Sequence, residues 1–294
     1  MIPGRPSPPT APYRGRIAPT PTGDLHVGHA RTFVEAWRRA EAAGGALVLR
    51  VEDLDPLRCR PAFAEHAVDD LAWLGVRWTE GPAYQSRRRP VYVDAWRRLR
   101  DLGAVYPSHA SRREVREAEA RSAAAHDPAH APHDDEEDAR EPLFPPALRP
   151  PAEAGRGAET PAGAVWRFRV PDGETVRFVD ARRGPQAFTA GADFGDFVVW
   201  RKDDVPAYEL AVVADDVAMG VTEVVRGEDL LRSTARQLLV YRALGARPPA
   251  WCHLPLARDA SGRRLAKRDG ALSVRALRAR GLAPAEVLAL AGRA

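Results

Sequence analysis

The chain has 294 residues, of which 45% are hydrophobic, with a formal net charge of +4 and a pI near 9.4. This length allows one large core or two smaller ones, and no apolar run approaches the ~20 residues of a membrane-spanning helix. Two cysteines, Cys59 and Cys252, are too few for a disulfide framework or for most cysteine metal sites. We therefore expect a cytoplasmic protein with no disulfide framework.

The N-terminal stretch, residues 1–15, is rich in proline and lacks the apolar segment of a signal peptide. We predict a flexible leader there. Residues 16–23 (RIAPTPTG) then combine a strand-like run with a proline and glycine turn.

The next stretch, HVGH at residues 26–29, lies at a predicted helix N-terminus. Histidines three residues apart share one helix face, and the unpaired amides of a helix N-terminus attract anions. Gly28 allows a ligand to approach the backbone closely. The pattern favours a nucleotide-phosphate site, although such histidine pairs also occur as ordinary surface or core residues.

A strand–helix–strand unit is predicted around this stretch. Residues 30–43 carry apolar side chains among charged ones and end at two glycines, which is typical of an amphipathic helix. Residues 46–51 (ALVLRV) suit a buried parallel strand, and the acidic run at 52–55 follows immediately. Open α/β sheets bind ligands at this end of their strands.

The middle of the chain changes character. Residues 117–163 contain few large apolar side chains, an acidic run at 134–138 and several prolines, so we predict a mobile loop over most of this range.

Alternating patterns follow the loop. Residues 164–170 and 175–180 flank the turn sequence PDG at 171–173, which predicts a β-hairpin. Residues 197–200 (FVVW) predict another strand, with Trp166 and Trp200 in the core.

The basic pI fits a polyanionic partner, and several arginine clusters could contact phosphates. They lie at residues 87–89, 97–98, 112–113, 182–183 and 263–264. Most clusters of this kind are simply solvated, so charge alone does not identify nucleic acid as the partner.

Five stretches, taken together, resemble the class I glutamyl-tRNA synthetase group in order and spacing over roughly residues 16–280. They are RIAPTPTG at 16–23, HVGH at 26–29, RVEDLD at 50–55, VRGEDL at 225–230 and RLAKR at 264–268. The resemblance implies an α/β fold in which a Rossmann-type catalytic domain is split by an acceptor-binding-like insertion. The expected parts are 16–105 and 201–250 for the two catalytic halves, 106–200 for the insertion, and 251–294 for a KMSKS-like loop and a short helical segment.

The length after the last motif distinguishes two branches of this group. Only 27 residues follow Lys267 in the 294-residue chain, so we expect no anticodon-binding domain. The chain therefore resembles the short branch, which transfers glutamate to the queuosine base at the wobble position of tRNA(Asp). Val212 agrees, because this position is usually asparagine in the full-length branch.

The resemblance also implies site residues. Those expected to act in adenylate formation are His26, His29 and Lys267, with Pro19 and Gly28 completing the ATP site. Those expected to bind glutamate are Arg16, Ala18, Thr20, Glu52, Tyr208 and Arg226. ATP would act with Mg²⁺. The KMSKS-like loop keeps a cation at Arg264 and lacks a hydroxyl at Ala266. Taken alone, Arg226 and Glu228 could equally pair with each other in a loop.

The insertion of this group often binds zinc through three cysteines and a tyrosine. The matching positions are Ser108, Ala110, Phe144 and Leu148, and none of these side chains holds zinc tightly. Histidines of the predicted loop lack rigid support and are poor substitutes. We expect no zinc.

The implied partners are glutamate, ATP and tRNA(Asp) carrying queuosine, with no membrane. Two alternatives stay open, a truncated glutamyl-tRNA synthetase that charges a tRNA 3′ end and a non-catalytic tRNA-binding relic. Another HxGH nucleotidyltransferase is a more distant possibility, which the stretches at 16–23 and 225–230 disfavour.

Overall fold

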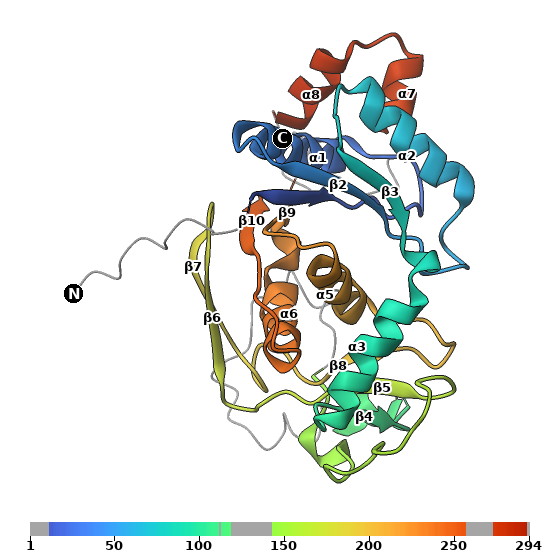
Figure 1. Ribbon diagram of the computed structural model, residues 1–294, viewed down its shortest axis with the longest axis vertical. Coiled ribbons are helices and arrows are strands. Elements are labelled where there is room, and N and C mark those ends of the chain that lie inside the picture. The colour runs from blue at the N-terminus through green and yellow to red at the C-terminus, as the bar shows by residue number, and fades with distance from the viewer. Residues whose placement is uncertain (1–11, 112, 119–142, 257–272, 293–294) are drawn as a thin grey trace, which may run out of the picture.

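The computed structural model describes residues 12–111, 113–118, 143–256 and 273–292, which form an elongated α/β molecule (Figure 1). Three sheets follow one another along its length. The first has the order β1-β2-β3, the second β7-β6-β10-β9 and the third β4-β5-β8. The strands are β1 (Arg14–Ile17), β2 (Ala46–Val51), β3 (Glu80–Tyr84), β4 (Val105–Ser108), β5 (Val165–Phe168), β6 (Thr175–Asp180), β7 (Gly184–Thr189), β8 (Phe197–Trp200), β9 (Glu223–Gly227) and β10 (Ala250–Leu254).

The first two sheets meet at their edges. The first is entirely parallel, and in the second both β9 and β6 run parallel to β10. The Thr222 amide, just before β9, donates to the Arg14 carbonyl of β1 at 2.8 Å. The carboxyl ends of β1, β2, β9 and β10 consequently lie near one another, which is where parallel α/β sheets bind ligands.

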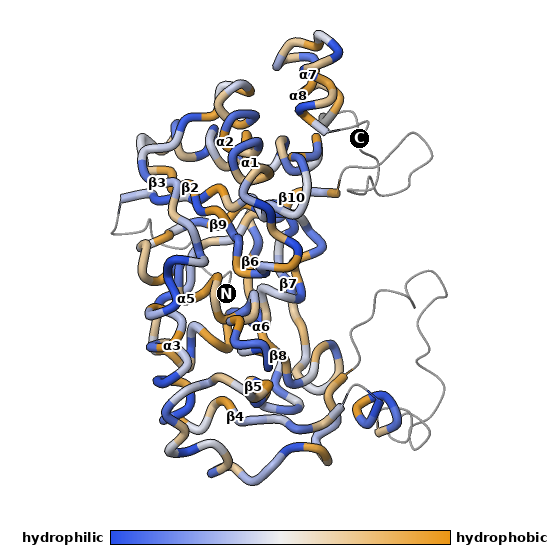
Figure 2. Tube along the Cα trace, turned by 90° about the vertical axis from the view of Figure 1, so that its right-hand side faces the viewer, coloured by the Kyte–Doolittle hydropathy of each residue, from blue (hydrophilic) through white to orange (hydrophobic). Residues whose placement is uncertain are grey.

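Helices cover these sheets and join them. They are α1 (Val27–Ala42), α2 (Pro61–Trp73), α3 (Arg89–Asp101), α5 (Tyr208–Ala218), α6 (Leu231–Ala243), α7 (Val274–Ala279) and α8 (Pro284–Gly292), with 3-10 turns η1 (Gln85–Arg87), η4 (Pro146–Leu148) and η5 (Glu228–Leu230). Helix α8 packs on α1 and α7 on α2. Figure 2 shows α7 and α8 at one end of the molecule and β4 and β5 at the other. Within the described ranges no helix has the length and apolarity to cross a bilayer.

The predicted strand–helix–strand unit is confirmed, because α1 and β2 lie where the pattern placed them. Apolar side chains at helical spacing, among them Phe33 and Val34, are buried against the first sheet. The turn after the helix requires glycine at Gly45, where a Cβ atom would lie 2.4 Å from the Tyr13 carbonyl oxygen. The unit therefore fixes the helix N-terminus relative to the end of β1.

Two large hydrophobic clusters form the core. One joins α3, α5 and α6 to the third sheet, and it includes Trp166 and Trp200, which are 2% and 0% exposed as the sequence predicts. The other joins α1, β1 and β2 to α7 and α8. Strands β9 and β10 contribute side chains to both clusters, and β1 and β2 to the second, so the carboxyl ends of these strands have rigid support.

The predicted hairpin of residues 164–170 and 175–180 is wrong. The turn at Gly173 exists, with a φ of 81°, but β5 pairs with β4 and β8 whereas β6 pairs with β7 and β10. Alternation identifies a strand and its buried face without naming its partner. As a result β6 and β7, which lie within the expected insertion, share a sheet with β9 and β10.

Two expected boundaries also differ. Strand β1 begins at Arg14, so residues 14 and 15 belong to a strand and not to the leader. Residues 143–163 pack on the third sheet, since Phe144 is 2% exposed and Arg149 binds Asp196 at 2.7 Å. This half of the range 117–163 differs from the expected mobile loop, and residues 119–142 lie outside the described residues.

Candidate active site

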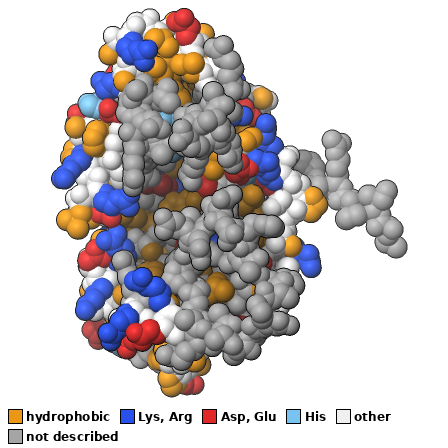
Figure 3. Space-filling model, turned by 180° about the vertical axis from the view of Figure 1, so that it is seen from behind, with side chains coloured by type: hydrophobic (Ala, Val, Ile, Leu, Met, Phe, Trp, Pro, Cys, Tyr) orange, Lys and Arg blue, Asp and Glu red, His pale blue; other side chains and the backbone are white. Residues whose placement is uncertain are grey.

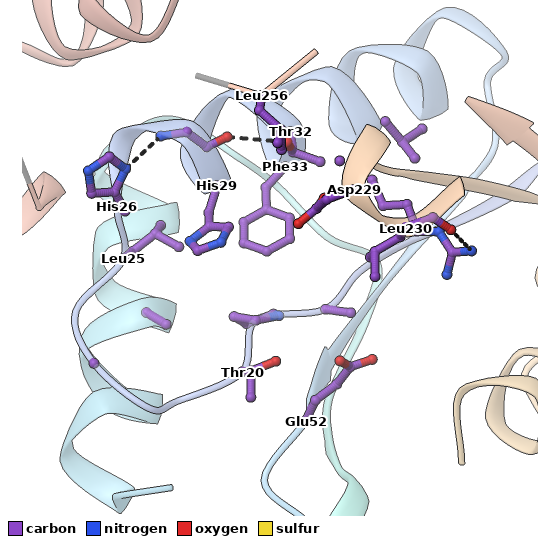
Figure 4. Close-up of a pocket in the computed structure, with 18 of the residues that line it drawn as sticks. Thr20, Leu25, His26, His29, Thr32, Phe33, Glu52, Asp229, Leu230 and Leu256 are labelled. Carbon is purple, nitrogen blue, oxygen red and sulfur yellow. Dashed lines mark hydrogen bonds between the residues drawn. The ribbon is translucent and has the colours of Figure 1, made fainter. Parts of the chain in front are cut away.

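A cavity of about 630 Å³ lies between the N-terminus of α1 and the carboxyl ends of β1, β2, β9 and β10 (Figure 4). Ten of the residues expected to form the site line it: Arg16, Ala18, Pro19, Thr20, His26, Gly28, His29, Glu52, Tyr208 and Arg226. The remaining one, Lys267, lies outside the described residues, as does the whole KMSKS-like loop. Four separate parts of the sequence therefore converge on one cavity.

The two histidines form the wall at the helix N-terminus. His26 is the N-cap of α1, and its Nδ1 accepts a 3.2 Å hydrogen bond from the Gly28 amide. The neutral His26 ring consequently carries its proton on Nε2. His29 is exposed to the cavity and stacks on Phe33, with ring centres 6.5 Å apart (Figure 4).

Glu52 follows directly after β2 and is held by an arginine of the same strand. Arg50 is fully buried and donates to Glu52 Oε1 at 3.1 Å and to Asp216 Oδ1 at 2.6 Å. Burial raises the pKa of Glu52 above its ordinary value, since its side chain is only 8% exposed. Figure 4 places Glu52 across the cavity from the histidines.

Arg16, like Arg50, lies beside Asp216 of α5. Its Nη1 donates to the Val225 carbonyl at 2.9 Å, and its Nε lies 4.0 Å from Asp216 Oδ1. Asp216 therefore connects Arg16 with Arg50, and through Arg50 with Glu52. Helix α5, through Asp216, thus orients both Arg16 and, by way of Arg50, Glu52 at the cavity wall.

Arg226, near the end of β9, makes a separate set of contacts. Its Nε donates to His253 Nε2 at 3.1 Å, its Nη2 to Thr234 Oγ1 at 2.7 Å and its Nη1 to Tyr208 Oη at 3.4 Å. The guanidinium also lies over the Trp251 ring, 4.8 Å from its centre.

The alternative in which Arg226 and Glu228 pair with each other is wrong. Glu228 binds Arg183 and accepts a 3.0 Å hydrogen bond from the Leu256 amide. Arg226 therefore remains directed at the cavity.

This arrangement can bind an amino acid with an acidic side chain. Two buried arginines, Arg16 and Arg226, can each bind a carboxylate through charge-assisted hydrogen bonds. Glu52 can offset an ammonium group beside them. The helix N-terminus with His26 and His29 provides a neighbouring position for phosphates.

The positions that bind zinc elsewhere in the resembled group are occupied differently here. Ala110, Phe144 and Leu148 pack in a small hydrophobic cluster with Tyr106 and Val115. The Tyr106 and Phe144 rings lie 6.3 Å apart, and Ser108 is buried on β4. Across the described part of the chain no group of three or more His, Cys, Asp or Glu residues could hold a metal ion.

Several members of the arginine clusters serve the structure itself. Arg88 binds Asp215, Arg89 binds Asp204 and Arg98 donates to the Leu244 carbonyl. On the face in Figure 3, the coloured basic side chains are interspersed with acidic ones. These arginines therefore give no evidence of a continuous basic surface.

The residues that hold the site together were not predicted from the sequence: Arg50, Asp180, Asp216, Thr234 and His253. Signals existed for two of them, because Arg50 is a lone charge in an otherwise apolar strand and Asp216 is an acid in an apolar helix. A charge in such a place requires a buried partner. His253 and Asp180 gave no comparable signal.

Comparisons with known proteins agree with this geometry. The family described as tRNA synthetases class I (E and Q), catalytic domain, matches residues 13–293. Two relatives, from Symbiobacterium thermophilum and Nitratidesulfovibrio vulgaris, are both named glutamyl-Q tRNA(Asp) synthetase. Each is 45% identical over 93% of this chain, which covers 84% and 83% of their lengths.

Longer ligases are also similar. A glutamate–tRNA ligase of Synechococcus is 41% identical over 92% of this chain. The solved glutamate-tRNA synthetase of Elizabethkingia anophelis superposes on 88% of the chain with a TM-score of 0.70 and 30% identity. The chain spans about half the length of these two proteins, 54% and 53%. With its fold, its cavity and its match over nearly the whole sequence, the chain belongs to the class I tRNA synthetases of the E and Q type.

Proposed function

We propose that the protein activates glutamate with ATP and transfers it to the queuosine base at the wobble position of tRNA(Asp). The observation that carries the proposal is the convergence of Arg16, Glu52 and Arg226 on one cavity with the HVGH helix N-terminus. The names of the relatives from Symbiobacterium thermophilum and Nitratidesulfovibrio vulgaris support the choice of acceptor.

The first step forms glutamyl-adenylate. A glutamate carboxylate oxygen attacks the α-phosphorus of ATP, a new P–O bond forms, and the bond to the bridging oxygen of the β-phosphate breaks to release pyrophosphate. In the second step a hydroxyl oxygen of the queuosine base attacks the adenylate carbonyl carbon, the bond from that carbon to the AMP phosphate oxygen breaks, and the products are an ester, AMP and the hydroxyl proton. Both steps depend on positioning and on stabilisation of developing charge.

The chain's residues have separate roles in this scheme. Arg16 and Arg226 bind the carboxylates of glutamate, Glu52 binds its ammonium group, and Tyr208 contacts its side chain. Ala18 and Thr20 complete that wall. His26 and His29 stabilise the phosphates, with Pro19 and Gly28 beside the nucleotide, and Lys267 balances charge on the leaving pyrophosphate.

Mg²⁺ enters this scheme as part of the substrate, bound to the triphosphate. The protein's residues orient the nucleotide to which the ion is bound.

A second candidate is a glutamate–tRNA ligase that charges a tRNA 3′ end, favoured by the 41% identity to ligases of that name. Glutamate-dependent exchange of labelled pyrophosphate into ATP tests the first step. For the proposed function we expect exchange with glutamate and no tRNA. This result discriminates between the two candidates, because full-length glutamyl-tRNA synthetases typically require tRNA for activation. Exchange that needs tRNA would favour the second candidate, and no exchange under either condition would contradict both.

A further inference from the structure

Among the described residues, Arg226 is a buried cation that no carboxylate contacts directly, and the buried Glu209 interacts with it only electrostatically. It is 4% exposed, and its contacts are the neutral acceptors His253 Nε2, Thr234 Oγ1, Tyr208 Oη and the Leu230 carbonyl. Among the described residues no carboxylate lies within 4.0 Å of its guanidinium. Arg50, by contrast, has three acidic neighbours. A buried guanidinium in this state is costly until an anion binds it.

Asp180 carries a negative charge on the far side of the His253 ring. Asp180, at the end of β6, is 2% exposed, and its Oδ2 contacts His253 Nδ1 at 2.7 Å. Its carboxylate also accepts from the amides of Arg182, Arg183 and His253, at 2.8 to 3.3 Å. These contacts fix Asp180 independently of Arg226.

The proton positions in this chain follow from arginine chemistry. Arginine only donates, so His253 Nε2 must accept from Arg226 Nε, and the ring proton must sit on Nδ1, where it donates to Asp180. Burial and the neighbouring Arg226 lower the pKa of His253 to about 4, so the ring stays neutral at physiological pH. The chain Asp180–His253–Arg226 therefore has one arrangement of hydrogen bonds.

We propose that Asp180 and His253 are positioning residues, which hold the Arg226 guanidinium oriented toward the cavity for a carboxylate of the amino-acid substrate. The aspartate stabilises the cation through the imidazole without occupying the guanidinium edge that the substrate needs. The inference rests on the proposed function, and it assigns part of the glutamate site to β6, a strand of the expected insertion.

The test compares Asp180→Asn with wild type in glutamate-dependent pyrophosphate exchange. Asparagine keeps the shape and removes the charge, and its single oxygen can accept either from the amides of Arg182 and Arg183 or from His253 Nδ1, but not from both. We expect the KM for glutamate to rise about tenfold, equivalent to about 1.4 kcal/mol, while the KM for ATP changes less than twofold. His253→Gln provides a second variant, because its amide oxygen can accept from Arg226 without a connection to Asp180.

Asp196→Asn is the matched control. Asp196 is a carboxylate of similar burial, 3% exposed, which accepts from Tyr106, Arg149 and the Val170 amide, away from the cavity. We expect this variant to lower the Tm as Asp180→Asn does and to leave the KM for glutamate unchanged. A purely structural role for Asp180 would give the two variants the same kinetic profile.

The outcomes separate this inference from the proposed function. No exchange by the wild-type protein would contradict the proposed function itself. An active wild type, with the KM for glutamate unchanged in folded Asp180→Asn and His253→Gln, would overturn the positioning role. An equal rise of both KM values would overturn it as well.

Discussion

Arg50 donates a 3.1 Å hydrogen bond to Glu52, two residues further along the chain, at the point where β2 reaches the cavity. Alternate residues of an extended segment project to the same side, so a single strand delivers both the acid and the cation that orients it. Arg50 keeps its contacts with Asp216 and Asp215 whether or not Glu52 is charged. A substitution of Glu52 should therefore have little effect on the contacts that hold Arg50 in place.

Glu52→Gln should raise the KM for glutamate about 10- to 100-fold, because it removes the anion expected to bind the substrate ammonium group and such charged hydrogen bonds contribute about 1.5–3 kcal/mol. The KM for ATP and the Tm should change little. Pyrophosphate exchange at varied glutamate and ATP measures both constants. Equal changes in the two constants would contradict the assignment.

His29→Ala should slow adenylate formation by about 10²-fold, the usual effect of losing one group that stabilises transition-state charge. His29 is exposed to the cavity, so the free energy of unfolding should be preserved. Lys267→Ala should slow adenylate formation to a similar extent, because Lys267 is proposed to balance charge on the leaving pyrophosphate. Single-turnover adenylate formation measures these rates, and near-normal rates in either variant would remove the proposed role.

His26 caps α1 and is proposed to stabilise the phosphates, and one pair of variants can separate these two roles. His26→Ala removes both the imidazole and the N-cap contact with Gly28, whereas asparagine is itself a favoured N-cap. We expect both variants to slow adenylate formation, but only His26→Ala to lose about 0.5–2 kcal/mol of stability. Urea unfolding beside the rate assay tests this. Normal kinetics in His26→Asn would restrict His26 to capping.

The pH dependence of stability should show the buried His253. Its pKa falls from 6.5 to about 4 on folding, so between these values the unfolded state binds more protons. The stabilisation is complete above pH 6.5 and is lost as the pH falls to about 4, about 3 kcal/mol in all. Asp180, whose pKa is lowered by its contact with His253 although burial opposes this, acts in the same direction.

Urea unfolding at several pH values should therefore show a shallower loss of stability below pH 6.5 in His253→Gln than in wild type. The two proteins share their remaining titratable groups, so the difference between the curves reports His253 together with the part of the Asp180 pKa shift that depends on it. Parallel curves would show that His253 is not held neutral by the fold.

The hydrophobic cluster of Tyr106, Val115 and Phe144 should stabilise the insertion by packing. Phe144→Ala should cost about 3–5 kcal/mol, the usual effect of truncating a buried phenylalanine. A chelator should leave the Tm of the wild-type protein unchanged. A Tm that falls with chelator would reveal a structural metal and contradict the packing account.

The sequence predicts local structure here better than it predicts which strands and side chains distant in the chain contact one another. Helix α1, strand β2 and the position of Glu52 follow from periodicity and from a short glycine turn, which depend on neighbours in the chain. The hairpin predicted for β5 and β6 is wrong for a different reason, because the alternation of apolar and polar residues does not indicate which strand lies alongside. The same limit concealed Asp180 and His253, which meet only because β6 pairs with β10.

We propose that the protein transfers glutamate to queuosine in tRNA(Asp). The direct measurement is transfer of labelled glutamate onto tRNA from matched cells that can and cannot make queuosine, with Glu52→Gln, assayed at glutamate well below its raised KM, as the impaired control. We predict labelling of the queuosine-containing pool alone, located in tRNA(Asp). Equal labelling of both pools would contradict the claim and indicate charging at the 3′ end, and labelling of neither would indicate a protein that binds tRNA without modifying it.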